Sequence, residues 1–295
     1  MSRRGWVLFA VMSVIWGIPY LLIRVAVREL SPGVIVFGRT APAALLLLPI
    51  ALRQDALRPL RARFPYVALF AIVEMAIPWF LLSRAEQHLS SSVTGLLVAT
   101  VPLIGALLAR ITSHGEHFGV RRLCGLVLGL SGVAVLVGVD VKGIDLASVG
   151  MVIVVAVCYA IGPFIVVKRL SDLPSLGVIN AAVALTALGY APYALTHLPA
   201  HVSLEAIGAV AGLAVVCTAL AFVLFFALIQ EVGPTRSTVI TYVNPAVAVL
   251  LGVTILGEPF TGGIAIGFPM ILVGSMLATS SGERRSEPEA VGTPS

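Results

Sequence analysis

The chain has 295 residues, of which 59% are hydrophobic and only 11% are charged, and its mean hydropathy is +1.05. This composition excludes a soluble domain of the same length and leaves no room for a separate globular domain. Lys and Arg outnumber Asp and Glu by 19 to 14. The basic residues lie in short loops between apolar runs, a distribution that sets membrane topology and does not indicate nucleic-acid binding.

Apolar runs of about 18–25 residues, long enough to cross a ~30 Å hydrocarbon core as a helix, occur ten times. The first imitates a signal peptide, but it is too long for one and no small-x-small cleavage site follows, so we expect it to be retained. The pattern predicts an all-α membrane protein with ten transmembrane helices and a disordered cytoplasmic tail at 281–295. In chain order the predicted spans are 6–26, 33–52, 65–84, 92–111, 120–138, 148–168, 176–196, 206–229, 237–256 and 263–280.

Basic residues divide unequally between alternate loops. One set of loops carries 14 Lys and Arg residues and the other set carries 4. The positive-inside rule therefore places both termini in the cytoplasm, which requires an even number of spans. Ten spans satisfy this requirement, and we expect a multi-pass protein of the cell (inner) membrane.

The last third of the chain repeats its middle. The offset is 142 or 143 residues in the strongest part and 144 residues in a weaker part, where Pro19 matches Pro163. We expect two repeats, at 7–138 and 148–280, each with five spans, so that the second enters the bilayer in the opposite direction. A duplicated, inverted unit of this kind is typical of transporters that open alternately to two sides. The residues that recur are Pro102, Gly115-Glu116, Gly125 and Gly132, as Pro245, Gly257-Glu258, Gly267 and Gly274.

Pairs of glycines four residues apart occur in the fifth and tenth predicted spans, at Gly125 and Gly129 and at Gly263 and Gly267. Small residues at this spacing allow two helix backbones to approach closely. The pattern predicts close helix packing. It leaves open whether these spans pack within one chain or between the protomers of a homodimer.

Two charged residues lie well inside the predicted spans, Arg39 in the second and Glu74 in the third. At 1.5 Å of rise per residue their depths in the bilayer differ by roughly 7 Å. An isolated charge in lipid is costly, so a mutual ion pair is the simplest interpretation. Two hypotheses remain open: the pair fixes two helices, or Arg39 binds a substrate carboxylate while Glu74 binds its amine or a proton.

Aromatic, amide and proline residues gather in the same spans. Proline inside a membrane helix frees a carbonyl, and paired interruptions in two halves point to a binding site at mid-membrane. The predicted helix breaks or hinges are Pro19, Pro78, Pro102, Pro163 and Pro245. The predicted substrate-binding residues are Trp16, Tyr20, Arg39, Glu74, Trp79, Tyr159, Asn180, Tyr242 and Asn244.

Signatures of other functions are absent from the sequence. It contains no phosphate-binding GxxxxGK[ST] motif, no HExxH and no GxSxG, so we expect neither direct ATP drive nor a membrane hydrolase. His114, Glu116 and His117 share one loop, but the pattern favours a loop or helix-entry role over a metal site. We therefore predict no enzyme activity, no cofactor and no metal.

Several of these motifs together resemble the EamA family of the drug/metabolite transporter superfamily. The resemblance rests on Gly233-Pro-Thr-Arg-Ser, Asn244-Pro-Ala-Val-Ala and Leu256-Gly-Glu-Pro-Phe, and on Trp16-Gly17 with Arg39 at the start of the chain. It covers roughly residues 7–280. It implies a ten-helix inner-membrane carrier with a central cavity between two inverted repeats, and typically export of amino acids or other small metabolites.

The sequence thus predicts a secondary transporter in the lipid bilayer with a small-molecule substrate, an exporter of amino acids or related amphipathic compounds. The alternative is a channel-like or lipid-handling membrane protein. Proton coupling and a homodimer are left open by the sequence.

Overall fold

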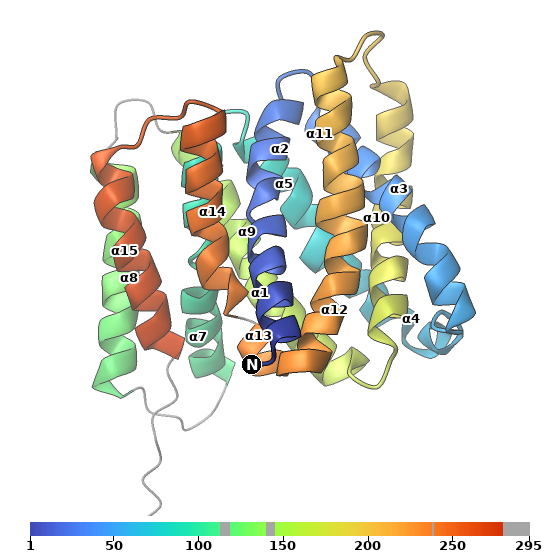
Figure 1. The fold of residues 1–295 in the computed structure, drawn as a ribbon, viewed down its shortest axis with the longest axis horizontal. Helices are drawn as coiled ribbons and strands as arrows, with labels where there is room; N and C mark the ends of the chain where they lie inside the picture. Colours follow the sequence, from blue (N-terminus) through green and yellow to red (C-terminus); the bar gives the residue numbers. More distant parts are fainter. Residues whose placement is uncertain (113–118, 140–144, 238, 280–295) are drawn as a thin grey trace, which may run out of the picture.

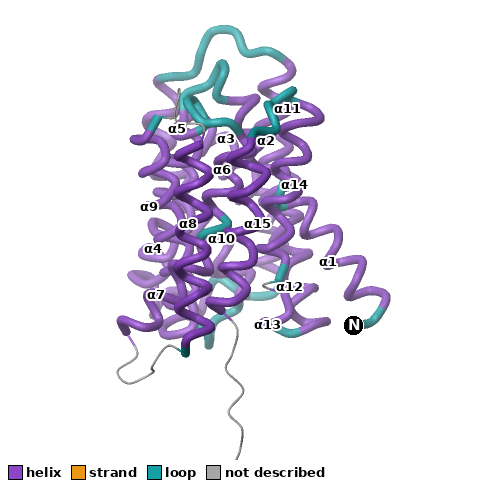
Figure 2. The backbone as a smooth tube through the Cα atoms, turned by 90° about the vertical axis from the view of Figure 1, so that its left-hand side faces the viewer, coloured by secondary structure: helices purple, strands orange, loops and turns teal. Residues whose placement is uncertain are grey.

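The computed structural model describes residues 1–112, 119–139, 145–237 and 239–279. Over these ranges every regular element is a helix, and nine helices are long and apolar enough to cross a membrane. A further apolar helix, α14 (Ile240–Ile255), is shorter. The predicted all-α, ten-helix membrane fold is confirmed. Figure 1 shows the helices side by side, and Figure 2 shows that the loops gather at the two ends of the bundle.

Five spans make up the first half of the chain, and several of them consist of more than one helical segment. The first span is interrupted by a short turn between α1 and α2, the second is one unbroken helix, and the third contains a π-helical turn. The segments are α1 (Arg3–Ile15), α2 (Ile18–Ala26), α3 (Pro32–Arg53), η1 (Arg58–Arg63), α4 (Phe64–Phe70), η2 (Ala71–Ala76), α5 (Ile77–Ala85), α6 (Ser91–Val98), α7 (Val101–Thr112) and α8 (Val120–Val139).

Five more spans make up the second half. The sixth and eighth spans also contain π-helical turns, η3 and η4. The segments are α9 (Leu146–Ile165), η3 (Val166–Leu170), α10 (Ser175–Thr196), α11 (Leu204–Ala214), η4 (Val215–Leu220), α12 (Ala221–Val232), α13 (Pro234–Ser237), α14 and α15 (Gly262–Thr279).

Short polar side chains start several of these helices. The hydroxyl of Ser90 accepts a hydrogen bond from the amide of Val93 at 3.2 Å, and Ser203 accepts one from Ala206 at 3.1 Å. Asp145 does the same for α9. Such caps satisfy amide groups that have no partner within the helix. They fix where the spans begin, at the boundary between apolar runs and loops.

Interruptions in the spans have local causes. The first span breaks at Trp16 and Gly17, just before Pro19, and the fourth breaks just before Pro102. The π turn η2 precedes Pro78, which has no amide hydrogen to donate to a carbonyl of the preceding turn. Pro163 lies inside α9 just before η3, and Pro245 lies inside α14 without breaking it.

The most extensive helix contacts join the two halves of the chain. The first span packs against the eighth, the second against the seventh, and the third against the sixth. The fourth packs against the ninth and the fifth against the tenth. Figure 1 shows this mixing, with α11 and α12 of the second half beside α1 and α2. The centre of the molecule is therefore lined by both halves.

The fifth and tenth spans pack backbone against backbone. A methyl group added at Gly274 of α15 would lie 2.4 Å from the amide nitrogen of Gly129 on α8, and one at Gly125 would lie 2.7 Å from the carbonyl oxygen of Gly274. We call this contact the glycine seam; it also includes Gly132 and Gly267. The glycine pattern thus serves packing within one chain, which answers the question left open by the sequence.

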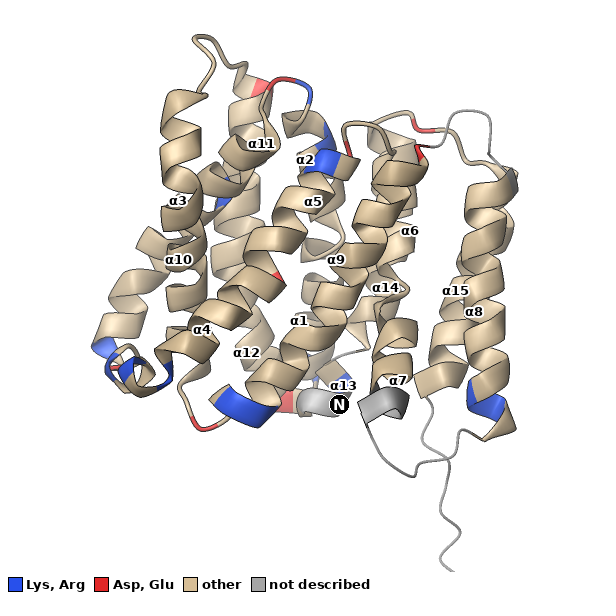
Figure 3. Ribbon diagram, turned by 180° about the vertical axis from the view of Figure 1, so that it is seen from behind, with Lys and Arg blue, Asp and Glu red and all other residues tan. Residues whose placement is uncertain are grey.

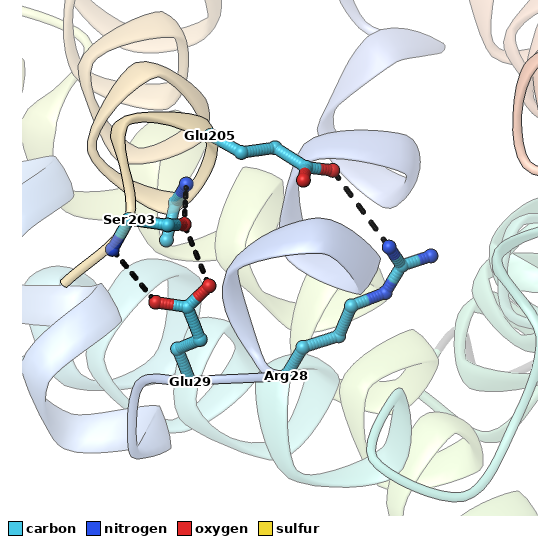
Figure 4. Close-up of polar contacts among 5 residues, drawn as sticks. Arg28, Glu29, Ser203 and Glu205 are labelled. Atoms are coloured by element: carbon cyan, nitrogen blue, oxygen red, sulfur yellow. Dashed lines mark hydrogen bonds and ion pairs between the residues drawn. The ribbon is translucent and has the colours of Figure 1, made fainter.

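Charged residues gather at the two ends of the bundle (Figure 3). At the end that carries the N-terminus, Arg63 lies 3.4 Å from Asp172. At the opposite end, Arg28 lies 3.7 Å from Glu205, and Glu29 accepts hydrogen bonds from the amide and hydroxyl of Ser203 at 2.8 and 2.6 Å (Figure 4). Both ends are therefore fastened by polar contacts between the two halves.

Candidate functional site

Arg39 lies at the centre of the polar interior. Its side chain leaves α3 and is only 6% exposed. The Nε atom donates a hydrogen bond of 2.9 Å to the hydroxyl of Thr218 on η4, in the eighth span. The guanidinium carbon lies 3.7 Å from the ring centroid of Trp79, a cation–π contact. Arg39 thus joins the second, third and eighth spans.

Glu74 lies on the π turn η2 and points toward the sixth span. A methyl group added at Gly162 of α9 would lie 1.7 Å from the Oε2 atom of Glu74. A side chain at that position would therefore displace the carboxylate from where it lies. The Oε2 atom is buried and has no hydrogen-bond partner within the described part of the chain.

The expected ion pair between Arg39 and Glu74 is absent from the described residues, and this expectation was wrong. The ion pairs found there lie at the ends of the bundle. Arg39 and Glu74 both belong to the first half of the chain. Arg39 contacts the eighth span and Glu74 points toward the sixth, so each interacts with the second half. Tyr159 interacts electrostatically with both charges and lies against Trp79. Tyr159 of the second half therefore interacts with both charges, which do not pair with each other.

Tyr20 completes this group. It lies on α2, just after the break near Pro19, and is 8% exposed. It interacts electrostatically with Tyr159 and Arg39. We call these five predicted residues the central polar cluster: Tyr20, Arg39, Glu74, Trp79 and Tyr159.

The other four predicted residues lie apart from the cluster and make contacts between helices. Trp16 packs edge-on against Phe222, with ring centroids 6.1 Å apart, and also contacts Phe225. Asn180 donates a hydrogen bond of 2.9 Å to the carbonyl of Ala44. The structure therefore assigns these two side chains to helix packing.

Tyr242 and Asn244 behave in the same way. The hydroxyl of Tyr242 lies 2.8 Å from that of Thr279 on α15. With its amide oriented to satisfy both groups, Asn244 donates to the carbonyl of Ser13 at 3.1 Å and to that of Ile240 at 2.9 Å. Asn244 thus ties the ninth span to the first.

Thr218 is a central residue that the sequence reasoning missed. It is fully buried, and besides accepting from Arg39 it donates to the carbonyl of Leu213, five residues earlier, at 2.8 Å. This bond satisfies a carbonyl of α11 just before the π turn η4, and the hydroxyl of Tyr190 satisfies that of Ala76 in η2 at 3.0 Å. The signal was present, since position 218 lies 144 residues after Glu74, at the offset of the weaker repeat.

No group of three His, Cys, Asp or Glu side chains that could hold a metal ion occurs among the described residues. The loop with His114, Glu116 and His117 lies outside the residues that the structure describes. Its counterpart Glu258 accepts hydrogen bonds from the amides of Ser91 and Ser92 at 2.7 and 3.0 Å. Glu258 therefore caps the N-terminus of α6 from another loop.

These features define a multi-pass membrane protein with a charged cluster inside its helix bundle. The chain belongs to the EamA-like transporter family, whose model matches it twice, over residues 3–138 and 146–280. It is therefore a membrane transporter.

Individual proteins with similar sequences are also named as transporters. The chain is 31% identical to the uncharacterized inner membrane transporter YedA of Escherichia coli (strain K12) over 287 residues, covering 92% of this chain and 89% of the relative. It is 23% identical to an uncharacterized transporter of Archaeoglobus fulgidus over 276 residues, covering 92% and 97% of the two chains. A protein of known crystal structure matches with a TM-score of 0.66 at 20% identity, covering 95% of this chain and 97% of that one. At this identity the structural match establishes the fold alone.

Proposed function

We propose that this transporter is a secondary carrier that exports small amphipathic metabolites, amino acids first, by alternating access, and that the central polar cluster is its substrate site. The observation that carries the proposal is Arg39. Its cation is buried in the middle of the bundle, and no carboxylate of the described residues lies within 4 Å of it. Charges inside membrane proteins mark substrate or ion pathways far more often than they serve as inert structure.

The chemistry of the cluster favours a zwitterion or an organic acid. Thr218 accepts one hydrogen bond from Arg39, which leaves most of the five N–H groups of the guanidinium for a ligand. A substrate carboxylate would bind there in a bidentate manner. Glu74 supplies a carboxylate for an amine, and Trp79 and Tyr159 supply aromatic walls for an apolar side chain.

Alternating access requires two halves that can move against each other. The proposal of two inverted five-span repeats is supported by the reciprocal packing of the spans: the first span contacts the eighth and the sixth contacts the third, while each remaining span contacts its equivalent. The substrate cluster draws Tyr20, Arg39, Glu74 and Trp79 from the first half and Tyr159 from the second. A site shared in this way can open to either side when the halves rock.

The unequal distribution of basic residues supports the proposed orientation in the inner membrane, with both termini cytoplasmic. Reporter fusions near Arg58 and Asp172 and at the C-terminus should read cytoplasmic. Fusions near His201 and Gly262 should read external. A C-terminus found outside would overturn the orientation and, with it, the even number of spans.

The first step is to identify the substrate. Metabolite concentrations in the medium and the cytosol are compared between cells that lack the transporter and cells that overexpress it. The compound identified is then tested for counterflow in proteoliposomes. Arg39→Ala should lower counterflow at least about tenfold, since it removes charge-assisted hydrogen bonds. Arg39→Lys should retain part of it, because lysine keeps the charge but loses the planar fork. The matched control is Arg63→Ala, an exposed arginine at the end of the bundle that carries the N-terminus.

Two results would contradict the proposal. Counterflow by Arg39→Ala at the wild-type rate would remove the cluster as the substrate site. Flux without stimulation from the opposite side would indicate the channel-like alternative instead of a carrier.

A further inference from the structure

Glu86 is a buried carboxylate that the substrate site does not use. It follows directly after α5, at the end of the bundle opposite to the N-terminus. The residue is 0% exposed, and neither carboxylate oxygen has a hydrogen-bond partner among the described residues. Its backbone carbonyl accepts a hydrogen bond from Arg24 of α2. Burial without a partner is costly for an ionised carboxylate.

The charges around Glu86 do not compensate for its burial. Glu258, from the loop before α15, repels it, and Arg24 attracts it. Glu258 is itself bound to the amides of Ser91 and Ser92, so its own charge is stabilised there. Burial, assisted by Glu258, raises the pKa of Glu86 well above its usual value despite Arg24.

A surface pocket lies beside Glu86. A pocket of about 290 Å³ at the same end of the bundle is lined by Arg24, Val27, Arg28 and Gln87. Gln87 is the sequence neighbour of Glu86, and Arg24 contacts its backbone. Two neighbours of Glu86 thus line a surface pocket on the side that we propose to be external.

Two tyrosines of the central polar cluster interact electrostatically with the buried acids. Tyr20 interacts electrostatically with Glu86 and with Tyr159, and Tyr159 interacts with Glu74. At 1.5 Å of rise per residue, Tyr20 lies about 9 Å below the external end of its span, Glu74 about 17 Å and Tyr159 about 20 Å. From the external end inward, the groups therefore run from Glu86 through Tyr20 to the depth that Glu74 and Tyr159 share within a few ångströms. Glu86 and Glu74 both carry a buried carboxylate oxygen without a hydrogen-bond partner among the described residues.

We propose that Glu86 is an external proton-binding site, and that Tyr20 and Tyr159 relay its proton to Glu74 beside the substrate site. This inference rests on the proposed carrier function and assigns its coupling ion, a proton entering from outside as substrate leaves. Chains of buried acids and hydroxyls serve as proton relays in other membrane proteins.

The relay conserves charge and protons. Protonated Glu86 gives its proton to the oxygen of Tyr20 while the hydroxyl proton of Tyr20 passes to Tyr159, and the proton of Tyr159 passes to ionised Glu74. Each tyrosine ends neutral, because a hydroxyl both donates and accepts. Glu86 is left ionised and takes its next proton from water in the pocket. Arg39 and Cys158 are the other titratable groups facing this path.

The first experiment tests proton binding without any substrate. The full chain is reconstituted in liposomes, and the infrared absorbance of protonated carboxyl groups is recorded at neutral pH. Glu86→Gln should remove one component of this absorbance. The control Glu205→Gln, an exposed carboxylate, should remove none. Unchanged absorbance in Glu86→Gln would mean that Glu86 is ionised and would overturn the proposal.

A second measurement uses the wild-type protein and so does not depend on the folding of a variant. Dicyclohexylcarbodiimide reacts with protonated carboxyl groups in apolar surroundings. Mass spectrometry after treatment at neutral pH should find Glu86 modified and Glu205 unmodified. Modification of neither residue would contradict a protonated Glu86.

The relay is tested by its rate. After an external pH jump on proteoliposomes, the protonation of Glu74 is followed by time-resolved infrared absorbance and assigned with Glu74→Gln. Glu86→Gln and Tyr20→Phe should each slow it by about tenfold or more. Tyr193→Phe, an exposed tyrosine at the same end, should leave the rate unchanged. A wild-type rate in both variants would remove the relay.

The tests of the proton site and the test of the substrate site can fail independently of each other. If Arg39→Ala abolishes counterflow while Glu86 is ionised at neutral pH, the carrier function stands and the proton site falls. If Glu86 is protonated but Arg39→Ala transports normally, the proposed substrate site falls instead.

Discussion

The glycine seam and the central polar cluster are two ways of joining the halves of this protein. In the seam, α8 and α15 touch through their backbones, so closely that a methyl group at Gly132 would lie 2.9 Å from the carbonyl oxygen of Gly267. In the cluster, the halves meet through side chains, as in the bond from Arg39 of α3 to Thr218 on the π turn η4. One contact depends on the absence of side chains and the other on their presence.

This difference suits different tasks. Lipid offers no hydrophobic driving force between helices, so the seam is stabilised by close van der Waals packing, which a small displacement would lose. The π turns η2 and η4 leave carbonyls that hydroxyl groups of Tyr190 and Thr218 satisfy. Such hydrogen bonds can be exchanged for others, and π turns occur frequently at functional sites. We expect the seam to stay intact while the cluster rearranges during transport.

The largest effect on stability should come from Gly274→Ala in the seam. The added methyl group would lie 2.4 Å from the amide nitrogen of Gly129 and 2.5 Å from its Cα atom, and these backbone atoms cannot rotate away. We expect a loss of about 2–3 kcal/mol in the free energy of unfolding, measured by thermal unfolding in detergent. The control is Gly138→Ala on α8, where the methyl group meets open space. Equal stability of the two variants would show that the seam is not tightly packed.

A smaller effect is expected from the link between Arg39 and Thr218. A double-mutant cycle with Arg39→Ala and Thr218→Val should give a coupling energy of about 2 kcal/mol, as for a hydrogen bond to a charged group. The corresponding cycle with Arg39→Ala and Glu74→Gln should give less, because Arg39 bonds to Thr218 of the eighth span while Glu74 points toward Gly162 of the sixth. A larger coupling for the second cycle would restore the direct pair that the sequence suggested.

The spans could be predicted from the sequence because an apolar run of bilayer length rarely forms anything except a membrane helix. The predicted span 33–52 corresponds to the helix Pro32–Arg53, and the predicted span 176–196 corresponds to the helix Ser175–Thr196. The spans 92–111 and 6–26 were also placed correctly, although each is divided into two helices. Hydropathy reports length and depth, and proline reports where a helix is interrupted.

The partners of the buried charges could not be predicted in the same way. The sequence indicates the depth of Arg39 and Glu74, but not the rotation of each helix or the identity of its neighbour. Consecutive spans are the expected neighbours, whereas the side chains reach the eighth and sixth spans. Glu86 lies just beyond the predicted span 65–84, and its burial depends on segments distant in the sequence, among them the loop of Glu258.

The smallest effect should appear at the end of the bundle, where Glu29 binds Ser203. Hydrogen bonds from Ser203 lower the pKa of Glu29 below its ordinary value of 4.5. A lowered pKa means that the contact favours the ionised form, so its contribution is complete above pH 4.5 and is lost as the pH falls through the lowered value. Hydrogen exchange of the Ser203 amide, corrected for its intrinsic pH dependence, should therefore lose protection only in acid.

Two comparisons make this measurement informative. Glu29→Gln should remove the protection of Ser203 at every pH, because an amide binds this hydrogen-bond donor more weakly than a carboxylate does. The amide of Gly129 in the seam should keep its protection throughout the same titration, since no titratable group is among the atoms that pack against it there. Joint loss of protection at Ser203 and Gly129 would indicate a single cooperative unit and would contradict the distinction between a fixed seam and exchangeable polar contacts.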